Sequence, residues 1–288
     1  SKKLATRVLI ITFLAFAIGF LWVYVFTPAL KTGVLLSEFA KEFFQPGSMF
    51  ILQPLQLFAE EYQVQKVTIP SSPEPLQADL YLPQVKEGTR RPATVMVYGI
   101  TDPEADARLA KFGQMFARAG IAVLIPRFPE LEQGTFTEQT VRQIEDSFLF
   151  LREQPSIDPG KVGLTSFCVG ASLAIVAAEN DRIGKDVAYI YAMAPYFDLR
   201  TLGPAIFSSQ QKIEGSWRAW SPEQYDRARA IFQNALLQAL PPADAEAIQG
   251  ALTRQDYVAT DNLASLSPDG KVVVRILSTR SPEELEQL

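Results

Sequence analysis

A cysteine stands at the centre of a short turn whose spacing suits nucleophilic chemistry. The chain from Ile157 to Ala178 reads IDPGKVGLTSFCVGASLAIVAA, and Cys168 has Ser166 and Gly170 two residues away on either side. A strand that turns at once into a helix leaves no room for branched side chains at these flanking positions. The central residue then lies at a helix N-terminus, where backbone N–H groups and the helix dipole favour negative charge. The pattern is typical of a nucleophile elbow with Cys168 as the attacking residue.

The segment resembles the elbow of the α/β-hydrolase fold and is most similar to that of the dienelactone hydrolase family, whose nucleophile is a cysteine. The lead-in IDPGKVGL also resembles the sequence before the fifth strand of that superfamily, and the resemblance spans roughly Tyr62 to Leu288. It implies a hydrolase of esters or lactones, with Cys168 as nucleophile and the backbone N–H groups of Val169 and Ile100 as oxyanion donors. No metal and no cofactor is implied. The alternative is that Cys168 is a small buried residue in a tight turn.

The chain departs from the family's pattern at the catalytic base. A cysteine elbow works with a histidine that an acid orients, and the 288 residues include no histidine. The family's acid follows the seventh strand, around Thr279 to Ser281, where no Asp or Glu stands; Asp198 is the candidate substitute. Tyr98 occupies a position where many relatives have histidine.

Two interpretations of the missing histidine stay open. Either the chain stops before an eighth strand and the histidine that follows it, or the protein is a non-catalytic relative that acts as a binding or scaffold module. A weaker third idea is redox sensing by Cys168, which has no second cysteine in the chain to resolve it.

Composition excludes several other classes of function. Hydrophobic residues make up 48% of the chain, enough for a globular domain with a sizeable core. The net charge is −5 and the isoelectric point is about 5.1, which argues against a nucleic-acid partner. With a single cysteine, no intramolecular disulfide can form.

An uncharged run near the N-terminus predicts a membrane anchor. Val8 to Leu30 contains no charged residue and, as a helix, would span a hydrocarbon core of roughly 30 Å. Lys2, Lys3 and Arg7 precede it, which by the positive-inside rule places the N-terminus in the cytoplasm and the following domain outside it. The alternative is a cleaved signal peptide, although the run is longer than a typical signal core and no clear cleavage site follows.

Residues 31–61 form an apolar segment beyond the predicted anchor at 1–30. Leu36, Phe39 and Phe43 fall on one face of a helix. Two interpretations fit this face: a helix that lies along the membrane surface, or a helix that packs on the following domain.

The rest of the chain, 62–288, predicts an α/β-hydrolase-like domain with a mainly parallel sheet and flanking helices. Strands are expected at Tyr62–Ile69, Leu76–Leu82, Ala93–Tyr98, Ile121–Pro126, Lys161–Thr165, Val187–Met193 and Lys271–Ser278. A helix is expected from Pro103 to Ala119 with Gly120 at its end, and another follows a capping box of Thr135 and Glu138. Because ligands bind at the carboxyl ends of parallel strands, Cys168, Gly99 to Ile100 and Pro195 to Asp198 are expected at one site.

An insertion of about 199–262 predicts a helical lid over that site. Helices are expected at Tyr225–Leu240 and Ala243–Leu252, separated by Pro241 and Pro242. Phe207, Trp217 and Trp220 are candidates to line an apolar pocket, or else to pack the lid onto the body. Ser281 and Pro282 predict one more helix start.

Overall fold

The computed structural model describes residues 12–19, 22, 27–43, 57–84, 88–101, 106–196, 198–220, 222–253 and 265–288. A six-stranded sheet forms its centre, in the order β1-β2-β4-β3-β5-β6. The strands are β1 (Tyr62–Ile69), β2 (Leu76–Pro83), β3 (Arg91–Val97), β4 (Ala122–Pro126), β5 (Ile157–Phe167) and β6 (Ile190–Met193). β3 to β6 pair in parallel, whereas β1 and β2 pair antiparallel at one side. The first six predicted strands are thus confirmed, with ends shifted by a few residues.

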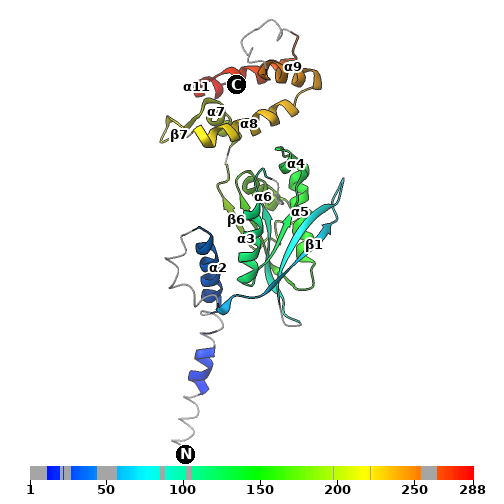
Figure 1. Ribbon diagram of the computed structural model, residues 1–288, viewed down its shortest axis with the longest axis vertical. Helices are drawn as coiled ribbons and strands as arrows, with labels where there is room; N and C mark the ends of the chain where they lie inside the picture. The colour runs from blue at the N-terminus through cyan, green and yellow to red at the C-terminus, as the bar shows by residue number, and fades with distance from the viewer. Residues whose placement is uncertain are drawn as a thin grey trace, which may run out of the picture.

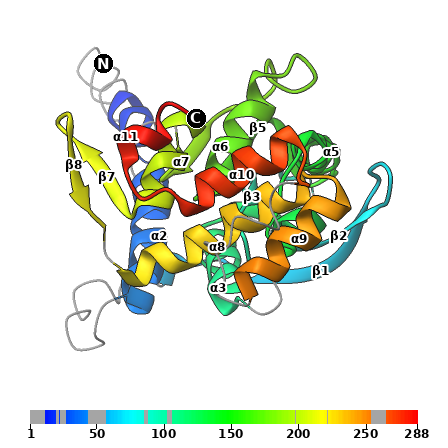
Figure 2. The same cartoon turned by 90° about the horizontal axis from the view of Figure 1, so that it is seen from above.

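Helices cover both faces of this sheet (Figure 2). α3 (Ala107–Arg118) packs on β2 and β4, while α5 (Glu138–Arg152) and α6 (Val169–Glu179) pack on β3, β5 and β6. The short helix α4 (Pro129–Glu132) precedes α5. Because β3, β4 and β5 are covered on both faces, β4 is wholly buried, and so are the stretches Ala93–Val97 of β3 and Val162–Ser166 of β5, as continuous apolar runs predict. The fold is therefore α/β with a mainly parallel, hydrolase-like sheet.

The cap of α5 differs from the prediction. Thr137, not Thr135, is the N-cap, and its side chain accepts the N–H of Gln139 at 3.1 Å. The third helical residue is Thr140, which completes the box in place of a glutamate. Glu130 of α4 accepts hydrogen bonds from the Thr137 N–H and hydroxyl, and this contact between helices selects the later cap.

β6 ends the sheet with an uncovered apolar edge. The side chains of Ile190, Tyr191 and Met193 are 41%, 55% and 43% exposed. Val176 on the neighbouring helix α6 is also about half exposed. Among the described strands of this sheet, none pairs with the outer side of β6.

Helix α2 (Thr27–Phe43) packs on α3, which favours the second of the two interpretations for residues 31–61 (Figure 1). Val34 and Ser37 are buried, and Glu38 forms an ion pair with Arg118 of α3 at 3.3 Å. Phe39 meets Phe112 of α3 with ring centroids 6.4 Å apart. The apolar face predicted from Leu36, Phe39 and Phe43 only partly forms this contact, because the Leu36 side chain is 58% exposed.

The predicted membrane anchor is only partly covered by the described residues. Residues 12–19 are helical, and Phe13 and Phe16 are largely exposed there. Residues 8–11, 20, 21 and 23–26 lie outside the described part of the chain. No helix within the described ranges has the length and apolar character needed to cross a membrane. The anchor therefore stays a prediction.

The chain beyond β6 folds into a helical layer above the carboxyl ends of the strands (Figure 1). Its elements are α7 (Leu199–Ser208), the hairpin of β7 (Gln210–Ile213) and β8 (Ser216–Ala219), α8 (Pro222–Gln238), α9 (Pro242–Thr253), α10 (Pro268–Ser278) and α11 (Pro282–Leu285). Phe207, Leu237, Ile248, Val273 and Leu285 share one hydrophobic cluster, separate from the core around the sheet. The helical layer therefore has a core of its own that extends to the end of α11.

The predicted seventh strand, Lys271–Ser278, is wrong: these residues belong to α10. Ser267 caps this helix by accepting the N–H of Gly270 at 3.1 Å, and Pro268 is its first residue. Val273 and Leu277, one helical turn apart, are buried in the cluster. The β-branched run resembles a strand, but the cap and the turn-spaced burial select the helix. The helix start at Ser281 is confirmed.

Candidate active site

Cys168 has the backbone of a nucleophile elbow. It stands between β5 and α6 with φ 55° and ψ −134°, a conformation that residues with a Cβ rarely adopt. Its N–H donates to the Met193 carbonyl at 2.9 Å, and its own carbonyl accepts the N–H of Ala171 at 2.9 Å. The side chain is exposed. The predicted strained turn is thus confirmed, and it presents the thiol beyond the carboxyl end of β5 at the N-terminus of a helix.

Glycines allow the chain to approach this turn closely. A Cβ on Gly170 would lie 2.1 Å from the Tyr98 carbonyl oxygen, so only glycine fits where α6 passes the end of β3. A Cβ on Gly99 would lie 3.0 Å from the Cβ of Cys168. Ser166 is buried and donates its hydroxyl to the Tyr191 carbonyl at 3.0 Å. These contacts bring the ends of β3, β5 and β6 together at Cys168.

The two predicted oxyanion donors, Val169 and Ile100, line the same cavity as the thiol. Val169 is the first residue of α6, where backbone N–H groups have no partner inside the helix. Ile100 follows Gly99, which is in contact with Cys168. Both residues also line the cavity into which Cys168 opens. Their backbones therefore suit the stabilisation of negative charge that develops beside the sulfur.

Cys168 opens into an apolar cavity of about 690 Å³ between the sheet and the helical layer. Its walls come from α2, the ends of β3, β5 and β6, α3, and α8. The aromatic members are Phe39, Tyr98, Phe112, Phe136, Phe167 and Phe232. Leu109, Met193, Ala228 and Ile231 add aliphatic surface. A volume in this range suits a ligand the size of a typical small organic molecule.

One ion pair provides the charge in this lining. Arg108 donates to Asp106 through Nε at 2.9 Å and through its terminal nitrogen at 2.7 Å. The hydrogen bond to Asp106, and then its charge, raise the pKa of Arg108. Asp106 also accepts the Arg108 N–H at 3.1 Å as the cap of α3. This carboxylate is therefore committed to the arginine and to the helix.

No side chain in the described part of the chain hydrogen-bonds to the sulfur of Cys168. Asp198, the candidate acid, precedes α7, and its carbonyl accepts the N–H groups of Thr201 and Leu202 at 3.2 and 3.1 Å. It is not one of the residues that line the cavity. The structure therefore positions Asp198 at the start of α7, outside the lining of the cavity.

Two tyrosines near the thiol have different environments. Tyr98 is buried, and its hydroxyl accepts the N–H of Phe128 at 3.0 Å, so it serves packing where many relatives have histidine. Burial, followed by the charge of Cys168, raises the pKa of Tyr196. Its backbone is held by Ser172, whose hydroxyl lies 3.0 Å from both the Tyr196 N–H nitrogen and carbonyl oxygen. The sequence predicts that Pro195 to Asp198 lies at the site, but it gives no signal that singles out Tyr196.

The aromatic residues expected to line the pocket lie elsewhere. Phe207 is buried in the cluster of the helical layer, and Trp217 lies in the hairpin under Lys212, with the ammonium 5.3 Å from the ring centroid. Neither these two nor Trp220 lines the cavity. Phe39 and Phe232 take that place, from α2 and α8. Their contribution depends on how distant elements pack, and no local pattern in the sequence signals it.

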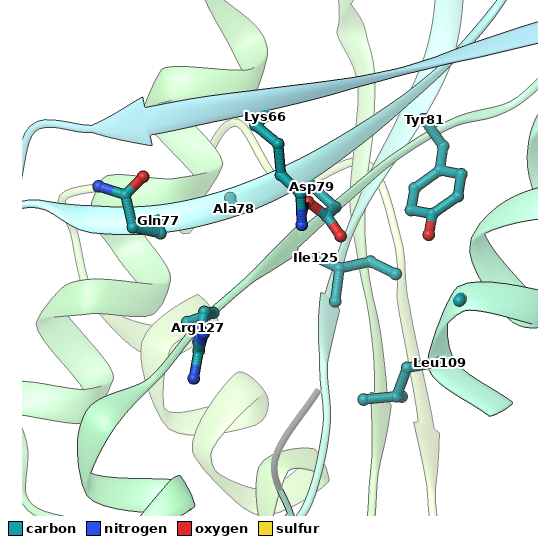
Figure 3. Close-up of a pocket in the computed structure, with 9 residues that line it drawn as sticks. Lys66, Gln77, Ala78, Asp79, Tyr81, Leu109, Ile125 and Arg127 are labelled. Atoms are coloured by element: carbon teal, nitrogen blue, oxygen red, sulfur yellow. Dashed lines mark ion pairs between the residues drawn. The ribbon is translucent and has the colours of Figure 1, made fainter. Parts of the chain in front are cut away.

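A second, smaller cavity of about 230 Å³ lies between β2, β4 and α3 (Figure 3). Its polar side chains are largely paired: Lys66 binds Asp79 at 2.8 Å, and Arg127 binds Glu132 at 2.9 Å. Tyr81 also lines this cavity, and its pKa is raised by burial and then by Asp79. The described residues that line this cavity include no serine or cysteine, so the cavity at Cys168 is the candidate active site.

Comparison with known proteins finds a family match over the part of the chain that contains the elbow. The model of the dienelactone hydrolase family matches residues 80–203, which include β3 to β6 and Cys168. A search of curated proteins finds no match.

Solved structures that match include a hypothetical protein from Pseudomonas aeruginosa, at 21% identity over 66% of this chain and 56% of that one, with a TM-score of 0.43. A bacterial heroin esterase matches at 19% identity over 57% and 56%, with a TM-score of 0.43. An esterase of Pyrobaculum calidifontis matches at 19% identity over 88% and 85%, with a TM-score of 0.46. The match thus spans only 56% of the length of the first two of these proteins. Over residues 80–203, the chain is similar to the dienelactone hydrolase family, as its elbow and lead-in suggested.

Proposed function

We propose that the protein is a hydrolase of carboxylic esters or lactones with Cys168 as its nucleophile. The observation that carries this proposal is the strained backbone of Cys168, with φ 55°, at the N-terminus of α6 and open to an apolar cavity. Strain of this kind costs of order 1–3 kcal/mol and tends to occur at functional sites. The match of residues 80–203 to the dienelactone hydrolase family supports the same reaction class.

The proposed reaction begins with attack of the Cys168 thiolate on the carbonyl carbon. A C–S bond forms while the carbonyl oxygen takes up negative charge, and the backbone N–H groups of Val169 and Ile100 stabilise that oxygen. The alcohol part of the ester then leaves with its bonding electrons and takes a proton. A thioester on Cys168 remains, and its hydrolysis needs a base to activate water.

The absence of histidine from these 288 residues sets the expected kinetics. We expect 4-nitrophenyl acetate to release one equivalent of 4-nitrophenolate per protein, with little turnover afterwards. Mass spectrometry should find the acetyl group on Cys168, and Cys168→Ala should abolish the burst. No acylation by any activated ester would contradict the proposal. Sustained turnover that depends on Cys168 would indicate a base other than histidine, and Asp198→Asn would then test the first candidate.

The second candidate is a non-catalytic binding or scaffold protein with a hydrolase fold. It is favoured by the lack of a hydrogen-bonding partner for the Cys168 sulfur in the described part of the chain. This candidate predicts ligand binding in the cavity with no transfer of an acyl group to Cys168.

We also propose that the chain is anchored in a membrane through Val8 to Leu30, with the N-terminus in the cytoplasm and the α/β domain outside it. The uncharged run, the three preceding cations and the exposed apolar residues of the helical stretch at 12–19 support this arrangement. The lipid bilayer and a small ester or lactone would then be the partners of the protein.

A further inference from the structure

Three phenylalanine rings form a continuous row that leads away from the thiol. Phe167 directly precedes Cys168 at the end of β5, and its ring centroid lies 5.2 Å from that of Phe112 on α3. Phe112 in turn lies 6.4 Å from Phe39 on α2. All three line the cavity, so one wall of it is an apolar track from Cys168 to α2.

The opposite wall is also apolar and comes from the helical layer. Ala228, Ile231 and Phe232 of α8 line the same cavity. Ile231 and Phe232 are partly buried, and Phe232 packs against the cluster of the helical layer. Arg108 is bound to Asp106 through two of its nitrogens, so the net charge of this pair in the lining is close to zero.

We propose that the cavity receives the apolar acyl chain of the substrate, and that α2, through Phe39, sets how long a chain it accepts. This inference rests on the proposed function, because it assigns a substrate class to the same thiol. Apolar surface on both walls favours an acyl group of several methylenes over acetyl, since each buried methylene strengthens binding roughly fourfold. A polar lactone would leave these walls unmatched.

Phe39 can select the length of the acyl chain only if α2 keeps its position on α3. The ion pair of Glu38 with Arg118 at 3.3 Å holds α2 on α3, and Val34 and Ser37 are buried at the same contact. Phe39 is 37% exposed, so its ring serves the cavity more than the core. We therefore expect its removal to change chain selection without unfolding the domain.

The test uses alkyl methanethiosulfonates, because Cys168 is the only cysteine in the chain. The thiolate attacks the alkylated sulfur, an S–S bond to the alkylthio group forms, and methanesulfinate leaves. Labelling rates with the methyl and octyl reagents are measured on the full chain by mass spectrometry and divided by their rates with N-acetylcysteine. We expect the octyl reagent to be favoured on the order of a hundredfold.

Variants on the two walls of the cavity show which wall causes the preference for the octyl reagent. Phe39→Ala should reduce octyl labelling about fivefold and leave methyl labelling unchanged. Ala228→Phe, which fills the cavity from the other wall, should also reduce octyl labelling selectively. Phe58→Ala is the matched control, because Phe58 is exposed and does not line the cavity. Circular dichroism confirms that each variant is folded.

The outcomes separate this inference from the proposed function. Equal normalised rates for both reagents, or equal effects of Phe39→Ala and Phe58→Ala, would overturn the acyl-chain inference. Octyl preference that follows Phe39 and Ala228 would support it, even if no ester acylates Cys168. Acylation by esters without any chain preference would leave the hydrolase proposal intact and refute the inference.

Discussion

Two glycines, Gly99 and Gly170, allow the backbone around Cys168 to adopt the tight turn that exposes the thiol. Gly170 passes the Tyr98 carbonyl at a distance that excludes a Cβ, and Gly99 lies directly against Cys168. These contacts join the end of β3 to the turn after β5, so the backbone at the predicted oxyanion donors is tied to the backbone that carries the sulfur. At the scale of residues, the absence of a side chain at Gly99 and Gly170 is therefore as necessary for the site as the presence of the thiol at Cys168.

Gly170→Ala tests this frame. The added Cβ would lie 2.1 Å from the Tyr98 oxygen, which is backbone and has little freedom to move. We expect a loss of about 1–3 kcal/mol or more in the free energy of unfolding, measured by urea denaturation. Gly160→Ala in β5 is the matched control, because a Cβ there would lie 3.6 Å from the Asp158 carboxylate, an ordinary contact. The control should change the free energy of unfolding by less than about 0.5 kcal/mol, as expected for an exposed position. Equal stabilities of the two variants would contradict this account.

At the scale of elements, the sequence predicts the sheet well and the helical layer less well. The runs Ala93–Tyr98 and Ile121–Pro126 are apolar throughout, which indicates covered central strands, and they became β3 and β4. Lys271–Ser278 is likewise rich in β-branched residues, yet it belongs to α10. Its buried residues Val273 and Leu277 are one helical turn apart, and Ser267 caps the helix. Local propensity is a weak guide where tertiary contacts choose between helix and strand.

The elbow was predictable because its chemistry lies within a few adjacent residues. The cavity walls were not, because Phe39 and Phe232 reach Cys168 only through the packing of α2 and α8. Two phenylalanines also differ in environment: Phe207 is buried in the core of the helical layer, whereas Phe39 lines the cavity. No spacing rule in one sequence distinguishes the two.

Ser267 is predicted to stabilise α10, the helix whose residues the sequence predicted as a strand. Its hydroxyl caps α10 through the Gly270 N–H and also contacts Asp244 of α9. Ser267→Ala should lower the free energy of unfolding by about 1 kcal/mol, as expected for a lost cap. Ser267→Thr keeps the hydroxyl and should restore most of this stability. If the alanine variant melts at the wild-type temperature, the cap does not stabilise α10.

For the whole molecule, the main feature is two hydrophobic cores with the candidate site between them. One core surrounds the sheet, and the other joins α7 to α11. Residues of α8 line the cavity although they belong to the second part. Access to Cys168 therefore depends on how the helical layer lies over the carboxyl ends of the strands (Figure 1).

The proposed anchor is tested on the whole chain. We expect the protein to sediment with membranes and to remain there after alkaline carbonate extraction, because a spanning helix is held by the hydrocarbon core. Deletion of residues 1–26 should move the protein into the supernatant, which immunoblotting of both fractions measures. High salt weakens only contacts between surface charges, so complete release of the full chain by salt would refute anchoring.

The positive φ of Cys168 sets the stability of the fold against the presence of a side chain at this position. A Cβ in that conformation costs of order 1–3 kcal/mol, and glycine would avoid the cost. A Cys168→Gly variant would therefore be the more stable protein, although it would lose the thiol that the proposed reaction needs. Cysteine and serine both carry a Cβ, so the backbone imposes a similar cost on either and does not itself select sulfur over oxygen.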